Sequence, residues 1–414
     1  MPDMIKNLII IVLMMLFLPG CFSGLPKSEC PLTPENRILL EKIDASLSRA
    51  SAYLLSKQSS DGTWHSETYG MFRDGTTLTP YVMSALFFMP EKDGQPRKAY
   101  RKGVDYLLTL IGDDGNLKTE LLFPVLTAAS ASRMVVLESK DEIHKQAQQA
   151  YLKIIRAWQL TESSGWTRDD PEYGGWGFSL HPPKKPADGQ PEEHFSESNM
   201  VATIFAIAAM RSARIPLDDP VWGNALIFVR RCQNFSDDPA LSDARFDDGG
   251  FYFIPEDALQ NKAGIAGTDS FGRERFHSYG TMTADGLRAL LQCGLPKDHP
   301  RVLAARKWLE RHFSVSQNPG NFNSDREVLR NATYYYWVWS VAHAFDRAGI
   351  RQVEQQNETV FWAEKLAEEL MRRQKDDGSW INSFTDARED DPLVATPWAA
   401  SALDICRRTI ACAK

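Results

Sequence analysis

The chain has 414 residues, of which 43% are hydrophobic and 24% are charged. This much apolar material supplies a sizeable core, so disorder as the main state is excluded. Its 47 basic and 54 acidic residues give a net charge of −7, which argues against non-specific binding to nucleic acid, and no nucleic-acid partner is expected.

The N-terminus carries a candidate export signal. An unbroken apolar run from Leu8 to Leu18 follows Lys6 and is too short to span a bilayer comfortably. It ends in Leu18-Pro19-Gly20-Cys21, which resembles the lipobox of bacterial lipoproteins. The resemblance implies a signal peptide at 1–20, a lipid on Cys21, and a mature protein anchored on the periplasmic side of a bacterial membrane. An ordinary secretory signal, or an uncleaved anchor with Cys21 incidental, is the alternative.

Residues 21–36 are predicted to be a tether, and two kinds of helix alternate through residues 37–414. Amphipathic helices, apolar on one face and wet on the other, are predicted at 37–58, 96–111, 144–160, 220–234, 300–313 and 358–374. More uniformly apolar helices, typical of buried positions, are predicted at 77–88, 120–136, 198–211, 279–292, 332–347 and 393–408. The alternation predicts an all-α fold, an (α/α)6 barrel of six helical hairpins in two concentric layers. An open superhelical solenoid of the same hairpins is the competing architecture.

A short motif recurs at turns between these helices. It is nearly complete in Gln58-Ser-Ser-Asp61-Gly62-Thr63-Trp64 and in Gln374-Lys-Asp-Asp377-Gly378-Ser379-Trp380, and degenerate copies lie at 113–116, 173–178, 247–251 and 319–322. Counting Gly175 and Gly250 as the turn glycines of two degenerate copies gives a repeat step of 53 to 75 residues. Asp-Gly supplies a positive-φ turn directly after a helix end. We expect the Gln amide to tie the turn to a neighbouring helix and the Trp ring to clamp one hairpin to the next.

The sequence Gln-x-x-Asp-Gly-Ser/Thr-Trp resembles the QW repeat of squalene-hopene and oxidosqualene cyclases. The β subunits of protein prenyltransferases share it more loosely. The resemblance spans roughly residues 37–408 and implies an α/α toroid around a central cavity. A fold does not fix a function, so the chemistry has to come from the site residues.

The catalytic motifs of both families are incomplete in this chain. Cyclases of the squalene-hopene type start their reaction from a protonated Asp in a DxDD motif, and the closest segment is Arg388-Glu389-Asp390-Asp391. A guanidinium in place of the first Asp lowers the pKa of a neighbouring carboxyl and disfavours the protonated acid. A prenyltransferase zinc site needs an Asp-x-Cys such as Asp404-Ile405-Cys406 and a later His, which the tail lacks. No metal and no cofactor is therefore expected.

Asp390, Asp391 and Asp285 are the candidate catalytic carboxylates. Asp285 interrupts an apolar helical pattern, so it either faces the cavity or pairs with Arg288 three residues later. Asp390 and Asp391 precede an apolar helix and are expected to cap it or to bind a polar part of a ligand. Squalene cyclisation is accordingly expected to be absent or very weak.

The candidate ligand-binding residues lie at the starts of the apolar helices and among their aromatic side chains. Those at helix starts either face the cavity or only cap their helix. The aromatic ones either contact a ligand or form helix-packing core. The set is His194, Glu197, Asn199, His277, Tyr279, Tyr335 and Trp398.

Three interpretations of the function stay open. The chain binds a hydrophobic or extended ligand, or a partner, in the central cavity. Alternatively, it is a terpenoid cyclase-like isomerase acting on an isoprenoid, or a carbohydrate-active (α/α)6 enzyme with two carboxylates ~5–10 Å apart across the cavity. A mostly aromatic cavity lining would indicate an isoprenoid, and a polar lining with carboxylates would indicate a sugar or peptide.

Overall fold

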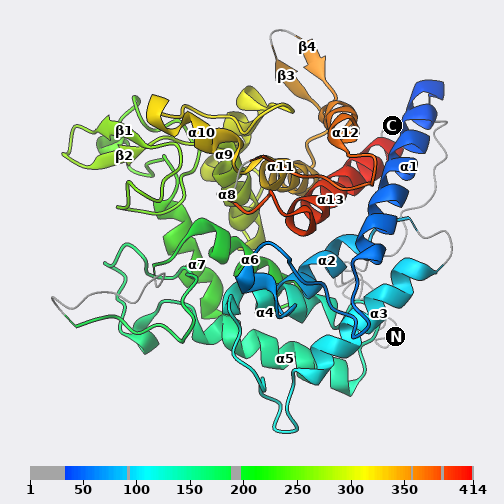
Figure 1. The fold of residues 1–414 in the computed structure, drawn as a ribbon. Coiled ribbons are helices and arrows are strands. Elements are labelled where there is room, and N and C mark those ends of the chain that lie inside the picture. The colour runs from blue at the N-terminus through cyan, green and yellow to red at the C-terminus, as the bar shows by residue number, and fades with distance from the viewer. Residues whose placement is uncertain (1–32, 91–93, 188–196, 356–357, 384–386, 413–414) are drawn as a thin grey trace, which may run out of the picture.

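Two concentric layers of helices make up the protein (Figure 1). A computed structural model describes residues 33–90, 94–187, 197–355, 358–383 and 387–412. The outer layer holds α1 (Pro34–Ser56), α3 (Gln95–Thr109), α5 (Glu142–Ala157), α7 (Pro220–Arg231), α9 (Pro300–His312) and α12 (Trp362–Arg373). The inner layer holds α2 (Leu78–Leu86), α4 (Pro124–Met134), α6 (Met200–Ser212), α8 (Gly280–Gln292), α11 (Tyr334–Ala348) and α13 (Pro392–Ala411).

The inner helices form a closed ring. Each packs against the next inner helix along the chain, and α13 packs against α2. Outer and inner helices alternate in direction, so the inner helices run parallel and the ring has an N-terminal mouth and a C-terminal mouth. The predicted α/α toroid is confirmed, and the open solenoid is wrong because its last hairpin would not reach its first.

Local sequence sets where these helices begin. Pro220 occupies the first position of α7, and the Asp219 side chain accepts a hydrogen bond from the backbone N–H of Val221. Every predicted boundary lies within four residues of the observed one. The largest differences are at the starts of α4 and α12. Residues 358–360, predicted as helix, form a strand instead.

Short elements lie in the connections. Strands β1 (Ile265–Thr268) and β2 (Glu274–Phe276) form one antiparallel hairpin, and β3 (Val353–Gln355) and β4 (Glu358–Val360) form another. The helix α10 (Glu327–Asn331) and 3-10 turns such as η1 (Gly70–Phe72) fill other loops. Within the described ranges, no helix combines the length and apolar character that crossing a membrane requires. The predicted signal peptide, Cys21 and the tether up to residue 32 lie outside the described residues.

Glutamines at the ends of outer helices fasten each hairpin to the following one. The Gln58 amide, after α1, donates to the carbonyl of Gly62 in its own turn (3.0 Å) and to that of Ala99 in α3 (2.8 Å). Gly62 has a φ of +93°, and a Cβ there would lie 2.4 Å from the carbonyl oxygen of Lys102 in α3. Glycine is thus required both by the backbone angle and by the close approach of the next helix.

Two further glutamines make the same kind of connection between hairpins, although the sequence motif does not reveal them. Gln159 donates to Gly174 and to Val221 in α7, and Gln233 donates to Gly249 and to Arg301 in α9. Insertions separate both from their glycines, which hides the spacing. The turn glycines are therefore residues 174 and 249, one position before those predicted.

The motif tryptophans act within their own hairpins. The indole N–H of Trp64 donates to the carbonyl of Leu54 (2.8 Å), and that of Trp380 to the carbonyl of Leu370 (2.8 Å). Both rings are fully buried. The prediction that they clamp one hairpin to the next is wrong in this detail, because the Gln amide and the Gly contact make that connection.

Candidate functional site

An aromatic cluster spans the centre of the ring. Trp398 on α13 lies 4.5 Å from Trp339 and 4.8 Å from Tyr336, both on α11, between ring centroids. Tyr81 on α2 is 4.8 Å from Trp398, and Phe205 on α6 is 6.2 Å from it. Helices α6 and α13 stand on opposite sides of the ring, so these rings meet across its diameter. We call Tyr81, Phe205, Tyr336, Trp339 and Trp398 the aromatic cluster.

Solvent reaches the inside of the ring. On four inner helices the partly exposed residues recur every three or four positions, so they lie on one face of each helix. Outer helices cover the opposite faces, so these stripes face the centre. We call the volume that they line the central space. The stripes are Leu126, Ser130 and Arg133; Val201, Phe205, Ala208 and Arg211; Trp339 and His343; Trp398 and Ser401.

Asp285 is fully buried beside the aromatic cluster. Its carboxylate accepts hydrogen bonds from the hydroxyl of Tyr336 (2.6 Å), from Ser340, and from the Arg288 guanidinium (2.9 Å). That guanidinium lies 4.4 Å from the ring centroid of Trp339. Burial raises the pKa of Asp285, and the charge of Arg288 opposes that rise.

The contacts of Asp285 favour an anchoring role. Three donors occupy its two oxygens, and one of them is a cation, which offsets part of the rise in pKa that burial causes. Of the two readings of this position, pairing with Arg288 is what the structure shows. Through Tyr336 the pair is also attached to the aromatic cluster, which brings the predicted residues Asp285 and Trp398 into one assembly.

The other candidate acids lie at the N-terminal mouth. Asp391 is the N-cap of α13, accepts from the backbone N–H of Leu393 (2.8 Å), and also accepts from the hydroxyl of Ser66. Asp390 accepts from the hydroxyl of Tyr69 (2.6 Å). The structure therefore uses Asp391 as the helix cap that the sequence suggested.

Arg388 does not pair with these acids. Its guanidinium lies 5.8 Å from the ring centroid of Tyr69 and 6.0 Å from that of Phe72, with no ion pair to a described carboxylate. From the sequence we expected the Arg388 guanidinium to act on a neighbouring carboxyl. In the structure it lies near aromatic rings instead.

Glu389 is a carboxylate near the aromatic cluster that sequence reasoning missed, since it stands at the variable position of the motif. It is fully buried and accepts from the backbone N–H groups of Tyr335 (2.9 Å) and Tyr336 (2.7 Å) and from Asn382. Burial raises the pKa of Glu389 to about 7, against the hydrogen bonds that lower it. By capping α11, this side chain fixes the position of Tyr336.

The predicted ligand residues at helix starts are separated from the aromatic cluster. Asn199 is the N-cap of α6 and accepts from the N–H of Ala202 (2.9 Å). Tyr279 is buried against Phe322, with 5.7 Å between ring centroids. His277 bonds to Asn323, and burial lowers the pKa of its imidazole.

The remaining predicted residues divide between the two mouths and the packing core. Glu197 is half-buried just before α6, and Tyr335 packs edge-on against Tyr334 with 5.1 Å between centroids. Of the predicted ligand residues, Trp398 is the one in the aromatic cluster. His194 and the lipidation candidate Cys21 lie outside the described residues.

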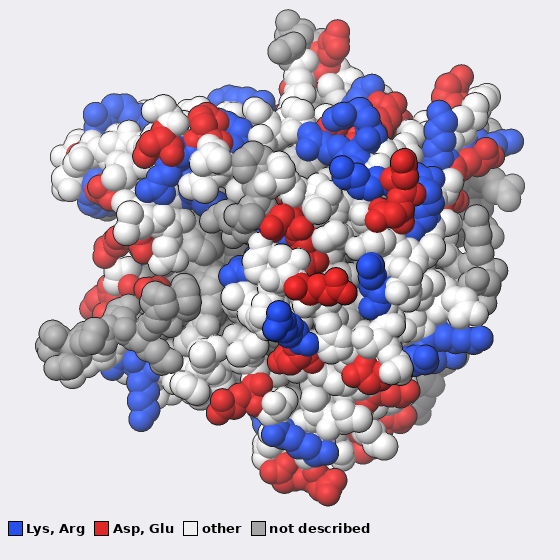
Figure 2. Space-filling model, in the orientation of Figure 1, with Lys and Arg blue, Asp and Glu red and all other residues white. Residues whose placement is uncertain are grey.

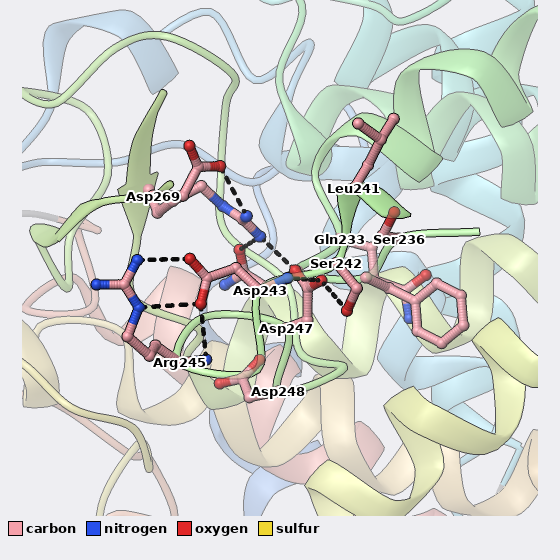
Figure 3. A network of polar contacts seen from close by, with 12 residues as sticks. Gln233, Ser236, Leu241, Ser242, Asp243, Arg245, Asp247, Asp248 and Asp269 are labelled. Atoms are coloured by element: carbon pink, nitrogen blue, oxygen red, sulfur yellow. Dashed lines mark hydrogen bonds and ion pairs between the residues drawn. The ribbon is translucent and has the colours of Figure 1, made fainter. Parts of the chain in front are cut away.

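A second group of acids, outside the ring, is paired internally. Asp243, Asp247, Asp248 and Asp269 converge in the loops between α7 and α8 (Figure 3). Arg245, Arg273 and Arg275 bind Asp243, Asp269 and Asp247 at 2.6 to 2.8 Å. The pair of Arg275 and Asp247 joins the loop before β1 to the β1–β2 hairpin. In the part of the chain that the structure describes, no three His, Cys, Asp or Glu side chains gather where they could hold a metal ion.

Comparison with known proteins confirms the fold. No protein-family model and no curated protein matches the sequence. A type II terpene cyclase, MstE from Scytonema, in complex with geranylgeranyl dihydroxybenzoate, is similar in structure, with a TM-score of 0.52 and 13% identity over 90% of this chain and 99% of that one. An inactive variant of the GH76A α-1,6-mannanase of Salegentibacter sp. HEL1_6, in complex with α-1,6-mannotriose, has a TM-score of 0.51 and 9% identity over 89% and 99%. The fold is an α/α toroid.

Proposed function

We propose that the protein binds a largely apolar small molecule of the isoprenoid type in the central space, against the aromatic cluster. The observation that carries the proposal is that Phe205, Trp339 and Trp398 keep part of their surface accessible although the ring encloses them. Large aromatic side chains have much apolar surface, and an apolar ligand that covers this surface gains binding energy from removing it from water.

The alternatives find less support. A carbohydrate-active enzyme needs two opposed carboxylates, and the carboxylate that contacts the aromatic cluster is Asp285, already bound by Arg288. A cyclase needs an acid that can donate its proton to the ligand, and the oxygens of Asp285 are already occupied by Arg288 and two hydroxyls. The cyclase neighbour holds a geranylgeranyl compound and the mannanase a mannotriose, and the aromatic lining resembles what the first would require. We therefore propose binding rather than catalysis, in an exported protein anchored by lipid on Cys21.

Equilibrium binding of geranylgeraniol and of α-1,6-mannotriose to the purified protein tests the proposal. We expect the alcohol to bind and to quench tryptophan fluorescence, and the trisaccharide not to bind. Trp398→Ala should weaken binding of the alcohol by about tenfold, because one aromatic contact is lost. Phe361→Ala removes a ring that is 48% exposed at the start of α12 and is the matched control.

The same samples, extracted after incubation with squalene or geranylgeraniol, test for catalysis. We expect no cyclic product. Mannotriose binding without alcohol binding would contradict the proposal. A cyclic product that disappears in Asp285→Asn or Asp390→Asn would replace it with the cyclase reading.

A further inference from the structure

Basic side chains gather around the central space on the C-terminal side of the aromatic cluster. Arg133 ends α4, Arg211 ends α6, and Arg347 ends α11, while Arg288 lies in the third turn of α8. His343 follows Trp339 by one turn, with 4.7 Å between their ring centroids. We call these five residues the basic layer. They come from four inner helices, so they surround the central space rather than one side of it.

The charges of this layer act on one another. Burial and the charge of Arg288 lower the pKa of Arg133. Burial and the charges of Arg211 and Arg288 lower the pKa of Arg347, and the charge of Asp346 opposes that change. Burial and the charges of Arg288 and Arg133 hold the pKa of His343 well below its usual range, so its imidazole is neutral. Helices α4 and α11 are opposite each other in the ring. Arg133 therefore acts on His343 across the centre.

Three of the four guanidiniums form no ion pair. Arg133, Arg211 and Arg347 make no hydrogen bond or ion pair with any described residue, and Arg288 alone is paired, with Asp285. Two arginines near the end of the inner helix α13 differ: Arg407 binds Asp44 (2.6 Å) and Arg408 binds Asp404 (3.0 Å). A helix C-terminus attracts a cation, but such cations usually bond to the last carbonyls, and these three do not.

A buried polar group on α8 lies close to Arg288. Gln292 follows Arg288 by one turn, on the same face of the helix. Its amide oxygen is buried without a hydrogen-bond partner among the described residues. Native proteins rarely leave such groups unpaired, which indicates bound water beside Arg288.

We propose that the central space binds an amphipathic anion, with its apolar body on the aromatic cluster and its carboxylate or phosphate head among Arg133, Arg288 and Arg347. The inference rests on the proposed function and adds the head group to it. An anion there relieves the mutual repulsion of the guanidiniums and forms charge-assisted hydrogen bonds away from bulk water. On the face that Figure 2 shows, acidic and basic side chains are interspersed, so that face gives no comparable attraction.

Three ligands that share one tail separate the head from the body: geranylgeraniol, geranylgeranoic acid and geranylgeranyl phosphate. We expect the acid and the phosphate to bind at least about tenfold more tightly than the alcohol, and added salt to reduce that preference. The anion that binds more tightly shows whether the site prefers a carboxylate or a phosphate head group. Equal binding of all three would overturn the inference and leave the proposed function standing, whereas failure of all three to bind would remove both.

Variants of the unpaired arginines test the position of the head. Arg133→Gln should reduce the preference for the anions over the alcohol to less than about threefold without weakening binding of the alcohol. Arg133→Lys should keep most of that preference. Arg73→Gln, an exposed arginine in the loop before α2 at the other mouth, is the control and should change nothing. If Arg133→Gln does not fold, Arg347→Gln, which removes an exposed and unpaired guanidinium, is measured in its place. A preference that survives both substitutions would show that the basic layer does not hold the head.

Discussion

The side chain of Gln374, at the end of α12, donates to the carbonyl oxygen of Ser46 in α1, 328 positions earlier in the chain, at 3.0 Å. The same nitrogen donates to Gly378 in its own turn (2.9 Å), and the hydroxyl of Ser46 donates back to the Gln374 oxygen (2.7 Å). Gly378 packs so closely on α1 that a Cβ would lie 2.4 Å from the carbonyl oxygen of Arg49. One residue thus closes the ring, since it holds the last hairpin against the first.

Replacing Gln374 by Glu should destabilise the fold. The change removes both donated hydrogen bonds and places a negative charge against two carbonyl oxygens. The Arg49 guanidinium, which donates to the Gln374 oxygen, offsets part of that cost, so we expect a loss of about 1–3 kcal/mol in the free energy of unfolding. Gln317→Glu makes the same charge change at an exposed site and is the control. Urea unfolding measures both. Equal stability of the two variants would show that the closure bond contributes nothing.

Trp380→Ala should be more damaging. The ring is fully buried and its N–H bonds to Leu370, so truncation leaves a large cavity and an unsatisfied carbonyl, at roughly 3–5 kcal/mol. The thermal midpoint should fall by several degrees. An unchanged midpoint would mean that the ring is exposed in solution.

Asp285 and Arg288 should be strongly coupled. Asp285→Asn leaves a buried guanidinium without its counter-charge and should cost roughly 3–5 kcal/mol, whereas the double variant with Arg288→Gln should cost less than the sum of the two single changes. The exposed pair of Arg306 and Glu310, at 2.8 Å, should show a coupling below about 1 kcal/mol in the same cycle. Additive effects at Asp285 and Arg288 would argue against the pair as the anchor of Tyr336.

Glu389 should make stability depend on pH. The folded protein raises its pKa from 4.5 to about 7, so the folded state holds the proton more tightly than the unfolded state. The stability that this group contributes is fully present below about pH 4.5 and is lost as pH rises through about 7, by about 3 kcal/mol in all. Glu389→Gln should remove that slope, and Glu120→Gln, at an exposed site, should retain it. Parallel curves of stability against pH for the wild type and Glu389→Gln would contradict this account.

Cys21→Ser should abolish both lipidation and processing. If a lipid on Cys21 anchors the chain, the variant loses its acyl modification and keeps its signal peptide, because signal cleavage of this type requires the cysteine. Metabolic labelling with a fatty acid measures the first effect, and the size of the protein on a gel measures the second. Cys30→Ser is the control. A Cys21→Ser protein that is still processed and still sediments with membranes would refute the anchor.

The sequence by itself determined the number and order of the hairpins. Apolar stripes on the outer helices and largely apolar inner helices such as α6, where Thr203 is the one polar residue between Met200 and Met210, fix which layer each helix joins, because burial follows local periodicity. The complete turn motifs around Gly62 and Gly378 could also be predicted from the sequence, since φ values near +90° require glycine there.

Only the tertiary structure decided what faces the centre. An inner helix that is apolar all round has no periodicity to mark its inward face, so Phe205 and Trp339 could not be singled out. Gln159 and Gln233 stayed hidden because insertions displaced their glycines. The basic layer needed the ring itself, because Arg133, Arg288 and Arg347 are far apart in the chain and each is an ordinary residue on its own helix. Ring closure brings those three charges around one enclosed space, and contacts of that range leave no trace in local spacing.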